Sequence, residues 1–261
     1  LLSCYLVQCL RSYFICQRPH HGTSSSLRAG SSVSAKSVGL YHILFRFAPP
    51  ICIFPAGLVQ WVGGDAQMKS KQEISAIITA LKALYPDAQC SLDYGKDYEL
   101  LFSVRLAAQC TDARVNLVTP ALFARYPTLE AFAEADVDEV GQYIHSCGFY
   151  NGKARDIVAC AQKLVNEYGG RVPGTMEELT GLPGVGRKTA NLILGDVFGQ
   201  PAYVCDTHCI RITGRLGITD GSKDPLQVER QLRERIPPKE SNNFCHRMVL
   251  FGRDTCTARS P

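Results

Sequence analysis

LPGVGRKTAN, residues 182–191, is the stretch that decides the fold of this chain. It places a Gly-x-Gly turn directly before Lys188, and Asp206-Thr207-His208 begins 18 residues after that lysine. Glycines let backbone N–H groups approach a phosphate closely, and a helix N-terminus favours the same anion. A helix N-terminus can also lower the pKa of a lysine, which then becomes a nucleophile that forms Schiff bases. The pattern suggests a protein that holds a DNA backbone and does covalent chemistry on a sugar.

The residues around this turn predict a helix on each side of it. Upstream, Thr175 and Glu178 have the spacing of a capping box, so a short helix is expected to end near Gly181. Downstream, a mostly apolar run reaches Phe198 and is closed by glycine and proline. The unit is therefore predicted to be helix, Gly-x-Gly turn, helix.

Two other interpretations of the turn compete with phosphate binding and lysine chemistry. Residues 181–189 nearly fit the nucleotide-binding pattern G-x-x-x-x-G-K-[ST], but Arg187 moves the lysine by one place and no strand precedes the turn. The dinucleotide fingerprint also fails, because Thr189 stands where the third glycine belongs. A structural turn with an exposed lysine remains open from the spacing alone, since glycine turns between helices are common.

The rest of the chain predicts an all-helical protein. Apolar residues at helical spacing, separated by Gly, Pro, Asn and Asp, predict helices over residues 72–84, 98–108, 120–123, 129–135, 137–145, 154–167 and 228–236. Asp206 has the position of an N-cap for a further helix over residues 207–216. No alternating strand pattern of useful length and no internal repeat is found.

The charge of the chain gives no general argument for nucleic acid binding. The net charge is +4, but residues 1–67 hold five of the 28 basic and one of the 24 acidic residues. The remainder therefore carries 23 of each. Any basic surface must be local, for example at Arg187, Lys188, Arg211 and Arg215 near the turn.

The first 67 residues differ from the remainder. The chain begins with Leu1, residues 23–37 are rich in serine, and the uncharged stretch 47–64 is broken by prolines and glycines, which argues against a membrane span. We expect residues 1–67 to be a leader that is disordered, or sequence upstream of a true start at Met68 that is not translated. The serine-rich, acid-poor composition also suits an organelle transit peptide, whereas a secretory signal is not supported.

The 12 cysteines are scattered without the spacing of a disulfide framework. Free thiols are commonly buried in cores, and disulfides are rare in reducing compartments. The cysteine pattern therefore predicts an intracellular protein, cytoplasmic or nucleoid-associated if bacterial.

Several motifs, in order, carry a resemblance to a known family. LPGVGRKTAN and VCDTH at residues 204–208 resemble the helix-hairpin-helix DNA glycosylases, close to the endonuclease III branch. AAQCTD at 107–112 resembles a helix-end motif of that family, GFYNGKA at 148–154 its minor-groove loop, and FGRDTCTAR at 251–259 the approach to its iron–sulfur loop. The resemblance extends from Met68 to Pro261.

The resemblance implies both a fold and an activity. The fold is all-α, with a six-helix domain over residues 90–200, a second helical domain built from residues 68–89 and 201–261, and a cleft between them. The activity is that of a bifunctional DNA glycosylase/AP lyase, a monomer that removes oxidised pyrimidines from double-stranded DNA in base excision repair. Lys188 is expected to attack C1′ of a flipped nucleotide and form a Schiff base that allows β-elimination. Asp206 is expected to assist the lysine and stabilise the charge on the sugar.

The resemblance also implies DNA-binding residues. Gln109 is expected to fill the gap left by the flipped base. Phe149, where the family often has leucine, is expected to wedge into the base stack, although core packing is an alternative for it. Gly184, Gly186 and the N–H groups around Arg187 are expected to bind phosphate without reading sequence. His208 is expected to pack or hydrogen-bond locally, with no catalytic role.

The resemblance further implies a [4Fe–4S] cluster held by C-x6-C-x2-C-x5-C. Cys256 matches the first of these ligands, and the sequence stops at Pro261, before the other three. Because thiolate ligation of such a cluster takes four cysteines, this chain as given is not expected to hold it in the manner of the family. A truncated gene fragment would account for this.

Two alternative functions stay open. One is a monofunctional adenine-type mismatch glycosylase, a branch that resembles this sequence but usually lacks the lysine. The other is a non-catalytic DNA-binding module that uses only the hairpin. Lys188 argues against the first of these, and the presence of both Lys188 and Asp206 argues against the second.

Overall fold

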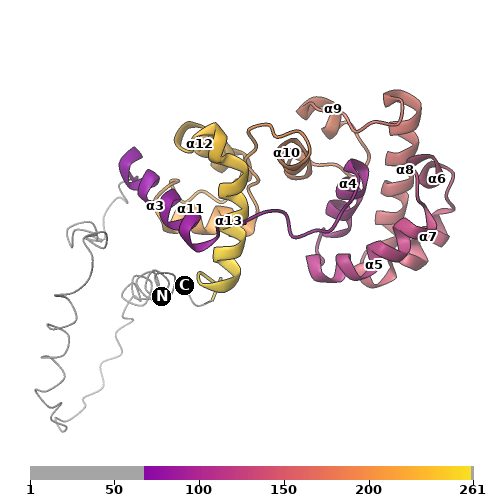
Figure 1. Ribbon diagram of the computed structural model, residues 1–261, viewed down its shortest axis with the longest axis horizontal. Helices are drawn as coiled ribbons and strands as arrows, with labels where there is room; N and C mark the ends of the chain where they lie inside the picture. Colours follow the sequence, from indigo (N-terminus) through magenta and orange to yellow (C-terminus); the bar gives the residue numbers. More distant parts are fainter. Residues whose placement is uncertain (1–67, 260–261) are drawn as a thin grey trace, which may run out of the picture. The chain divides into compact units, whose positions relative to one another are not determined.

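The computed structural model describes residues 68–259, and all regular structure within them is helical (Figure 1). The helices are α3 (Lys71–Leu84), α4 (Asp97–Leu106), α5 (Asp112–Arg125), α6 (Leu129–Ala133), α7 (Val137–Tyr143), the 3-10 helix η1 (His145–Cys147), α8 (Tyr150–Tyr168), α9 (Met176–Thr180), α10 (Arg187–Asp196), α11 (Thr207–Arg215), α12 (Pro225–Arg235), the 3-10 helix η2 (Pro238–Glu240) and α13 (Ser241–Asp254). These residues contain no strand, which confirms the predicted all-α class. The predicted leader, with its uncharged stretch and its cysteines, lies outside the described residues.

The helix starts that could be predicted from capping residues are confirmed. Thr175 accepts a hydrogen bond from the backbone N–H of Glu178 at 3.2 Å and begins α9. Asp206 accepts one from the backbone N–H of Cys209 at 2.7 Å and begins α11. Both side chains satisfy a donor that a helix leaves without an internal partner in its first turn.

The prediction of a short helix at residues 120–123 was wrong in its extent. Helix α5 begins eight residues earlier, at Asp112, because Thr111 caps it by accepting a hydrogen bond from the N–H of Arg114 at 3.2 Å. Pro120 lies inside this helix and does not start it. A proline removes one backbone donor without preventing the helix from continuing when the surroundings hold it.

Helix α13 was not among the predicted elements. Two asparagines and a glycine interrupt its sequence, and they weaken the helical signal. Its buried residues include Phe244, Met248 and Phe251, spaced four and three residues apart, so the apolar stripe that stabilises the helix was present in the sequence.

The buried apolar side chains form two clusters. The first is built from α4 to α10 and contains Phe132, whose ring packs against that of Phe102 at a centroid distance of 5.0 Å. The second is built from α3, α11, α12 and α13 and includes Tyr203. Leu192 of α10 packs against both clusters. Helix α10, which carries Lys188, therefore lies where the two cores meet.

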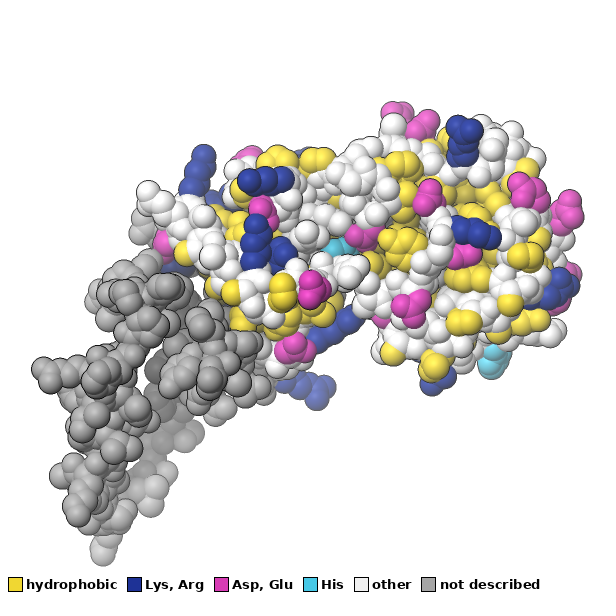
Figure 2. All heavy atoms as spheres, viewed as in Figure 1, with side chains coloured by type: hydrophobic (Ala, Val, Ile, Leu, Met, Phe, Trp, Pro, Cys, Tyr) yellow, Lys and Arg dark blue, Asp and Glu magenta, His cyan; other side chains and the backbone are white. Residues whose placement is uncertain are grey.

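The surface of the described residues shows no large region of one charge in the view of Figure 2. Lys and Arg side chains alternate there with Asp and Glu. This agrees with the equal numbers of basic and acidic residues that follow Gln67 in the sequence. Among the helices of residues 68–259, none has the length and apolar content needed to cross a bilayer.

Helix α3 contains a carboxylate that should make stability depend on pH. Glu73 accepts hydrogen bonds from the backbone N–H of Ser70 and from Lys69, which lower the pKa of Glu73 from 4.5 to about 2. A carboxyl whose folded pKa is depressed stabilises the fold above its unfolded pKa and loses this contribution as pH falls towards the folded value. The contribution is therefore present above pH 4.5 and declines between pH 4.5 and about 2.

We expect Glu73→Gln to melt at a lower temperature than the parent chain at pH 7 and to lose less stability on acidification. The amide cannot be protonated in this pH window, so its hydrogen bonds do not change there. Thermal melting followed by circular dichroism between pH 7 and pH 3 checks this. Parallel curves for the two proteins would contradict it.

Candidate active site

The predicted hairpin joins α9 to α10 through residues 181–186, and Gly184 is required within it. Gly184 has φ of +73°, and a Cβ added there would lie 2.8 Å from Cβ of Asp156 and 2.9 Å from Nε of Arg105. Those two residues form an ion pair at 2.6 Å between α8 and α4. Gly186 differs, because a Cβ there would meet nothing within 4 Å. The surface next to Gly186 is open to a ligand.

We expect Gly184→Ala to lower the free energy of unfolding by about 1–3 kcal/mol, because the alanine would be strained at positive φ and would displace the ion pair. Gly186→Ala is the matched control, with an expected change within about 0.5–1 kcal/mol. Urea denaturation of both variants and the parent measures the difference. Equal stabilities for the two variants would contradict the tight approach at Gly184.

Lys188 lies in the first turn of α10, two residues after the N-cap Gly186, and its side chain is exposed. The N–H groups of this turn have no acceptor inside the helix, so they are available to an anion. Asp112 begins helix α5. Burial raises the pKa of Asp112, but the hydroxyl of Ser91 and the positive charges of Arg253 and Lys188 outweigh it and lower that pKa.

Asp206 is half-buried at the start of α11, and its cap bond uses Oδ1. Its Oδ2 accepts no hydrogen bond from residues 68–259. A carboxylate has acceptor positions on both oxygens. The capping role that the sequence predicts therefore leaves Asp206 free to accept a proton or to act on a nearby positive charge.

His208 lies in the first turn of α11, two residues after Asp206. Burial lowers the pKa of His208; the charge of Asp206 opposes this, and the charges of Arg211, Arg253 and Lys188 reinforce it. His208 itself is held by Arg211, whose Nη2 lies 3.1 Å from Nδ1 of the ring, so the predicted local hydrogen bond is confirmed.

Gln109 and Phe149 share an uncommon backbone conformation. They are the non-glycine residues with positive φ in the described part of the chain, at 54° and 47°. A left-handed conformation costs an L-residue about 1–2 kcal/mol. Gln109 is exposed and the Phe149 side chain is 75% exposed, so core packing does not explain Phe149. Strained, exposed side chains of this kind are concentrated at ligand-binding sites.

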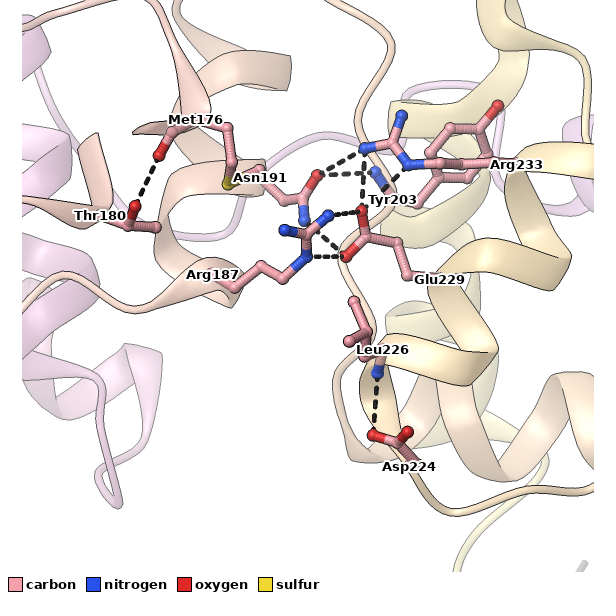
Figure 3. Close-up of polar contacts among 9 residues, drawn as sticks. All are labelled: Met176, Thr180, Arg187, Asn191, Tyr203, Asp224, Leu226, Glu229 and Arg233. Carbon is pink, nitrogen blue, oxygen red and sulfur yellow. Dashed lines mark hydrogen bonds and ion pairs between the residues drawn. The ribbon is translucent and has the colours of Figure 1, made fainter. Parts of the chain in front are cut away.

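The guanidinium of Arg187 is occupied by a neighbouring helix (Figure 3). Its Nε and Nη2 donate to the two oxygens of Glu229 on α12, at 2.7 and 2.8 Å. Arg233 and Asn191 donate to the same carboxylate. The Glu229 side chain is 4% exposed; burial raises its pKa, but the hydrogen bonds from Arg187 and Arg233 lower it overall. This cluster, Arg187, Asn191, Glu229 and Arg233, fastens α10 to α12.

Sequence reasoning did not single out Glu229. The available signal was a carboxylate directly after Val228 and three residues before Leu232, inside the buried stripe of α12. A charge in such a stripe is rare unless a partner compensates it. The side chain of Arg187 thus has a structural partner, and its expected phosphate contact rests on its backbone N–H.

Arg211 and Arg215 bind the C-terminal segment that follows α13. Arg211 donates to the carbonyl of Cys256 at 2.8 Å, and Arg215 donates to Sγ of Cys256 at 3.1 Å and to the carbonyl of Thr257 at 2.9 Å. These hydrogen bonds hold both guanidinium groups at the C-terminal segment, so the local basic surface expected near the hairpin stays a prediction. Sequence reasoning could not detect main-chain acceptors more than 40 residues away.

Cys256 is the described residue that could contribute to a metal cluster. It is fully buried, and Nη1 of Arg215 donates to its sulfur at 3.1 Å. No group of three or more His, Cys, Asp or Glu side chains in residues 68–259 is placed to hold a metal ion. A [4Fe–4S] cluster takes four thiolates, so these residues supply one ligand and do not by themselves fit the group.

Comparison with known proteins agrees with this arrangement. The family model described as HhH-GPD superfamily base excision DNA repair protein matches residues 102–238. Endonuclease III of Synechocystis sp. is 48% identical over 192 residues, which cover 73% of this chain and 87% of that protein. Endonuclease III of Bacillus subtilis is 39% identical over 194 residues, covering 74% and 89%.

Solved structures give the same result. A trapped covalent intermediate of endonuclease III with DNA is 43% identical, with a TM-score of 0.71, and the match covers 74% of this chain and 91% of that one. A thermostable thymine-DNA glycosylase, 20% identical with a TM-score of 0.66 over 73% and 90%, shares the fold. The chain belongs to the HhH-GPD superfamily of base excision DNA repair proteins and, within it, to the endonuclease III family.

Proposed function

We propose that this chain is a bifunctional DNA glycosylase and AP lyase that removes oxidised pyrimidines from double-stranded DNA. Its endonuclease III homologues have this activity. The observation that carries the assignment to residues is that Lys188 is exposed beside the open surface at Gly186, while Asp206 caps α11 through Oδ1. Lys188 projects from the first turn of α10 and Asp206 from the N-cap of α11.

Lys188 is the nucleophile in this proposal. A damaged base inside a duplex must first be flipped out. The neutral amine of Lys188 attacks C1′, the bond from C1′ to the base breaks, and the base leaves with the electron pair and takes up a proton. Asp206 accepts a proton from the lysine and stabilises the positive charge that develops on the sugar.

Strand cleavage follows from the covalent intermediate. The sugar ring opens to a Schiff base between Lys188 and C1′. The positive charge on this iminium lets a proton leave C2′, and the C3′–O bond then breaks with the phosphate as leaving group. This β-elimination cuts the strand on the 3′ side of the damaged nucleotide.

The residues around the nucleophile hold the DNA. The N–H groups of Gly184, Gly186 and Arg187 bind a backbone phosphate, which positions the duplex without reading its sequence. Gln109 fills the gap left by the flipped base, and Phe149 enters the base stack as an apolar wedge. The exposure and the strained backbone of both residues support these roles.

Three further assignments complete the proposal. Endonuclease III proteins typically carry a [4Fe–4S] cluster, and we assign Cys256 as the first of its ligands, with Arg215 holding the sulfur. The chain acts as a monomer on DNA with damaged bases or abasic sites, inside the cell.

Borohydride trapping tests the proposal. The full chain is mixed with a duplex that carries one oxidised pyrimidine, and borohydride is added to reduce any Schiff base to a stable amine. We expect a protein–DNA adduct on a denaturing gel and, without borohydride, a strand cut on the 3′ side of the lesion. The structure of a trapped covalent intermediate with DNA exists for a related endonuclease III.

The other outcomes separate the competing functions. Release of a base without an adduct would indicate a monofunctional glycosylase, and an adenine opposite a mismatched base is then the substrate to supply. Binding to the duplex without base release or an adduct would indicate a DNA-binding module. Either result, obtained with a chain whose circular dichroism is helical, would overturn the lyase assignment.

A further inference from the structure

Lys153 is a buried lysine that the proposed chemistry does not use. It lies in the first turn of α8, and 1% of it is exposed. A lysine is almost never fully buried without a partner, because removing its charge from water is costly. Its Nζ donates to two backbone carbonyls, that of Leu106 at 2.8 Å and that of Cys147 at 2.7 Å.

The two carbonyls are placed to stabilise an ammonium group. Leu106 is the last residue of α4 and Cys147 the last of η1. Carbonyls at the end of a helix accept no hydrogen bond from within the helix, and they lie at the negative end of its dipole. Lys153 forms no ion pair with a carboxylate of residues 68–259. These two carbonyls therefore compensate the cost of burying its positive charge. Burial lowers the pKa of Lys153, and the neighbouring Cys110 and Cys147 oppose this.

Each carbonyl leads directly into one of the strained residues. Gln109 comes three residues after Leu106, and Phe149 comes two residues after Cys147. Both have positive φ, a conformation that persists only where the surroundings hold it. One ammonium group is therefore bonded to both segments that place an exposed, strained side chain.

Each of the two segments also carries a cysteine, Cys110 after Gln109 and Cys147 before Phe149. Burial, and then the influence of Cys110, raises the pKa of Cys147 to about 11. Cys147 is 1% exposed, and Cys110 is half-buried. The thiols thus provide a chemical probe of whether the two segments stay together.

We infer that Lys153 is a positioning residue that holds the Gln109 turn and the Phe149 loop in one fixed relation, so that both side chains enter the duplex together. The inference rests on the proposed function of Gln109 and Phe149 as the residues that replace the flipped base. Lys153 touches neither the DNA nor the reacting atoms; it acts through the two carbonyls.

A double-mutant cycle tests the inference in the full chain. The affinity for a duplex with a tetrahydrofuran abasic-site analogue is measured for the parent, Lys153→Met, Gln109→Ala/Phe149→Ala, and the combination. We expect Lys153→Met to weaken binding on the order of 10-fold in the parent background and less than about 2-fold where both side chains are already removed.

The control is Lys71→Met, because Lys71 is an exposed lysine on α3, and this variant should bind as the parent does. Equal losses in both backgrounds would overturn the inference, since a lysine that only stabilises the fold gives additive effects.

Cleavage of single-stranded DNA with an abasic site separates a positioning role from a role in folding. A general loss of fold would lower the cleavage of this substrate, whereas a loss of positioning would not. No base stack has to be filled in that substrate, so Lys153→Met should cleave it at the parent rate while losing activity on the duplex. Loss of both activities in equal measure would overturn the positioning role. If Lys153→Met does not fold, Lys153→Gln, which keeps a donor for one carbonyl, replaces it in the same cycle.

Thiol labelling separates this inference from the proposed function. Peptide mapping after treatment with a maleimide should find Cys147 protected in the parent and labelled at least several-fold faster in Lys153→Met, with no DNA present. A parent chain that forms no borohydride adduct would sink the lyase assignment and leave this result standing. Unchanged protection of Cys147 in a folded Lys153→Met variant would contradict the inference that Lys153 keeps the two segments together.

Discussion

Lys188→Gln in the full chain is expected to give no borohydride-stable adduct and to lower cleavage at an oxidised pyrimidine on the order of 1000-fold or more. An amide has no basic lone pair for C1′ and cannot form the iminium that makes the C2′ proton acidic. Glutamine keeps most of the length and polarity of lysine, and Lys188 is exposed at the start of α10. The substitution should therefore remove the chemistry and leave the fold unchanged.

A gel assay of cleavage and trapping, run with circular dichroism of each protein, checks this expectation. Lys223→Gln is a matched control, because Lys223 is exposed in the loop before α12, away from the hairpin in sequence. It should trap and cut as the parent does. Adduct formation by Lys188→Gln at the parent level would assign the nucleophile to another amine.

Glu229→Ala is expected to lower the free energy of unfolding by about 2–4 kcal/mol. The Glu229 side chain is 4% exposed and accepts from Arg187, Arg233 and Asn191. Its removal leaves the amide of Asn191, which is 2% exposed, without this acceptor. The value is below the usual cost of breaking a fully buried pair because both arginine side chains are more than 40% exposed and water can solvate them.

Urea denaturation measures this loss, with Glu234→Ala as the control on the same helix. Glu234 is exposed, so its replacement should change the free energy of unfolding by no more than about 0.5 kcal/mol. Because Glu229 fastens α10 to α12, its alanine variant should also trap less DNA than the control at temperatures where both remain folded. Equal stability of the two variants would show that the cluster around Glu229 contributes nothing.

The parts of this structure that could be predicted are those decided within a few residues. Thr175 and Asp206 cap helices by bonding to their own backbone three residues later. Gly184 satisfies a turn that needs positive φ. The start of α10, which carries Lys188, could also be predicted, because the hairpin before it is formed by residues that are neighbours in the sequence.

The parts that could not be predicted depend on residues distant in the sequence. Arg187 and Glu229 are 42 residues apart, and Lys153 reaches a carbonyl 47 residues away. The helix predicted over residues 154–167 begins one residue after Lys153, and no pattern of residue types shows that this lysine donates to a carbonyl at the end of α4. The sequence predicts a helix boundary at Pro120, whereas α5 begins at Asp112 and continues through the proline.

The extended position of Phe149 has a consequence for how a rare lesion is found. A ring that is 75% exposed before DNA arrives does not have to be deployed by a conformational change. In the proposed wedge role, each encounter with a duplex would press this aromatic ring against a base step, and the response would depend on how easily that step opens. Intact, well-stacked steps resist, while steps weakened by damage yield at lower cost. The proposed role would therefore make the search a test of duplex stiffness, made before any pocket has examined the chemistry of the base.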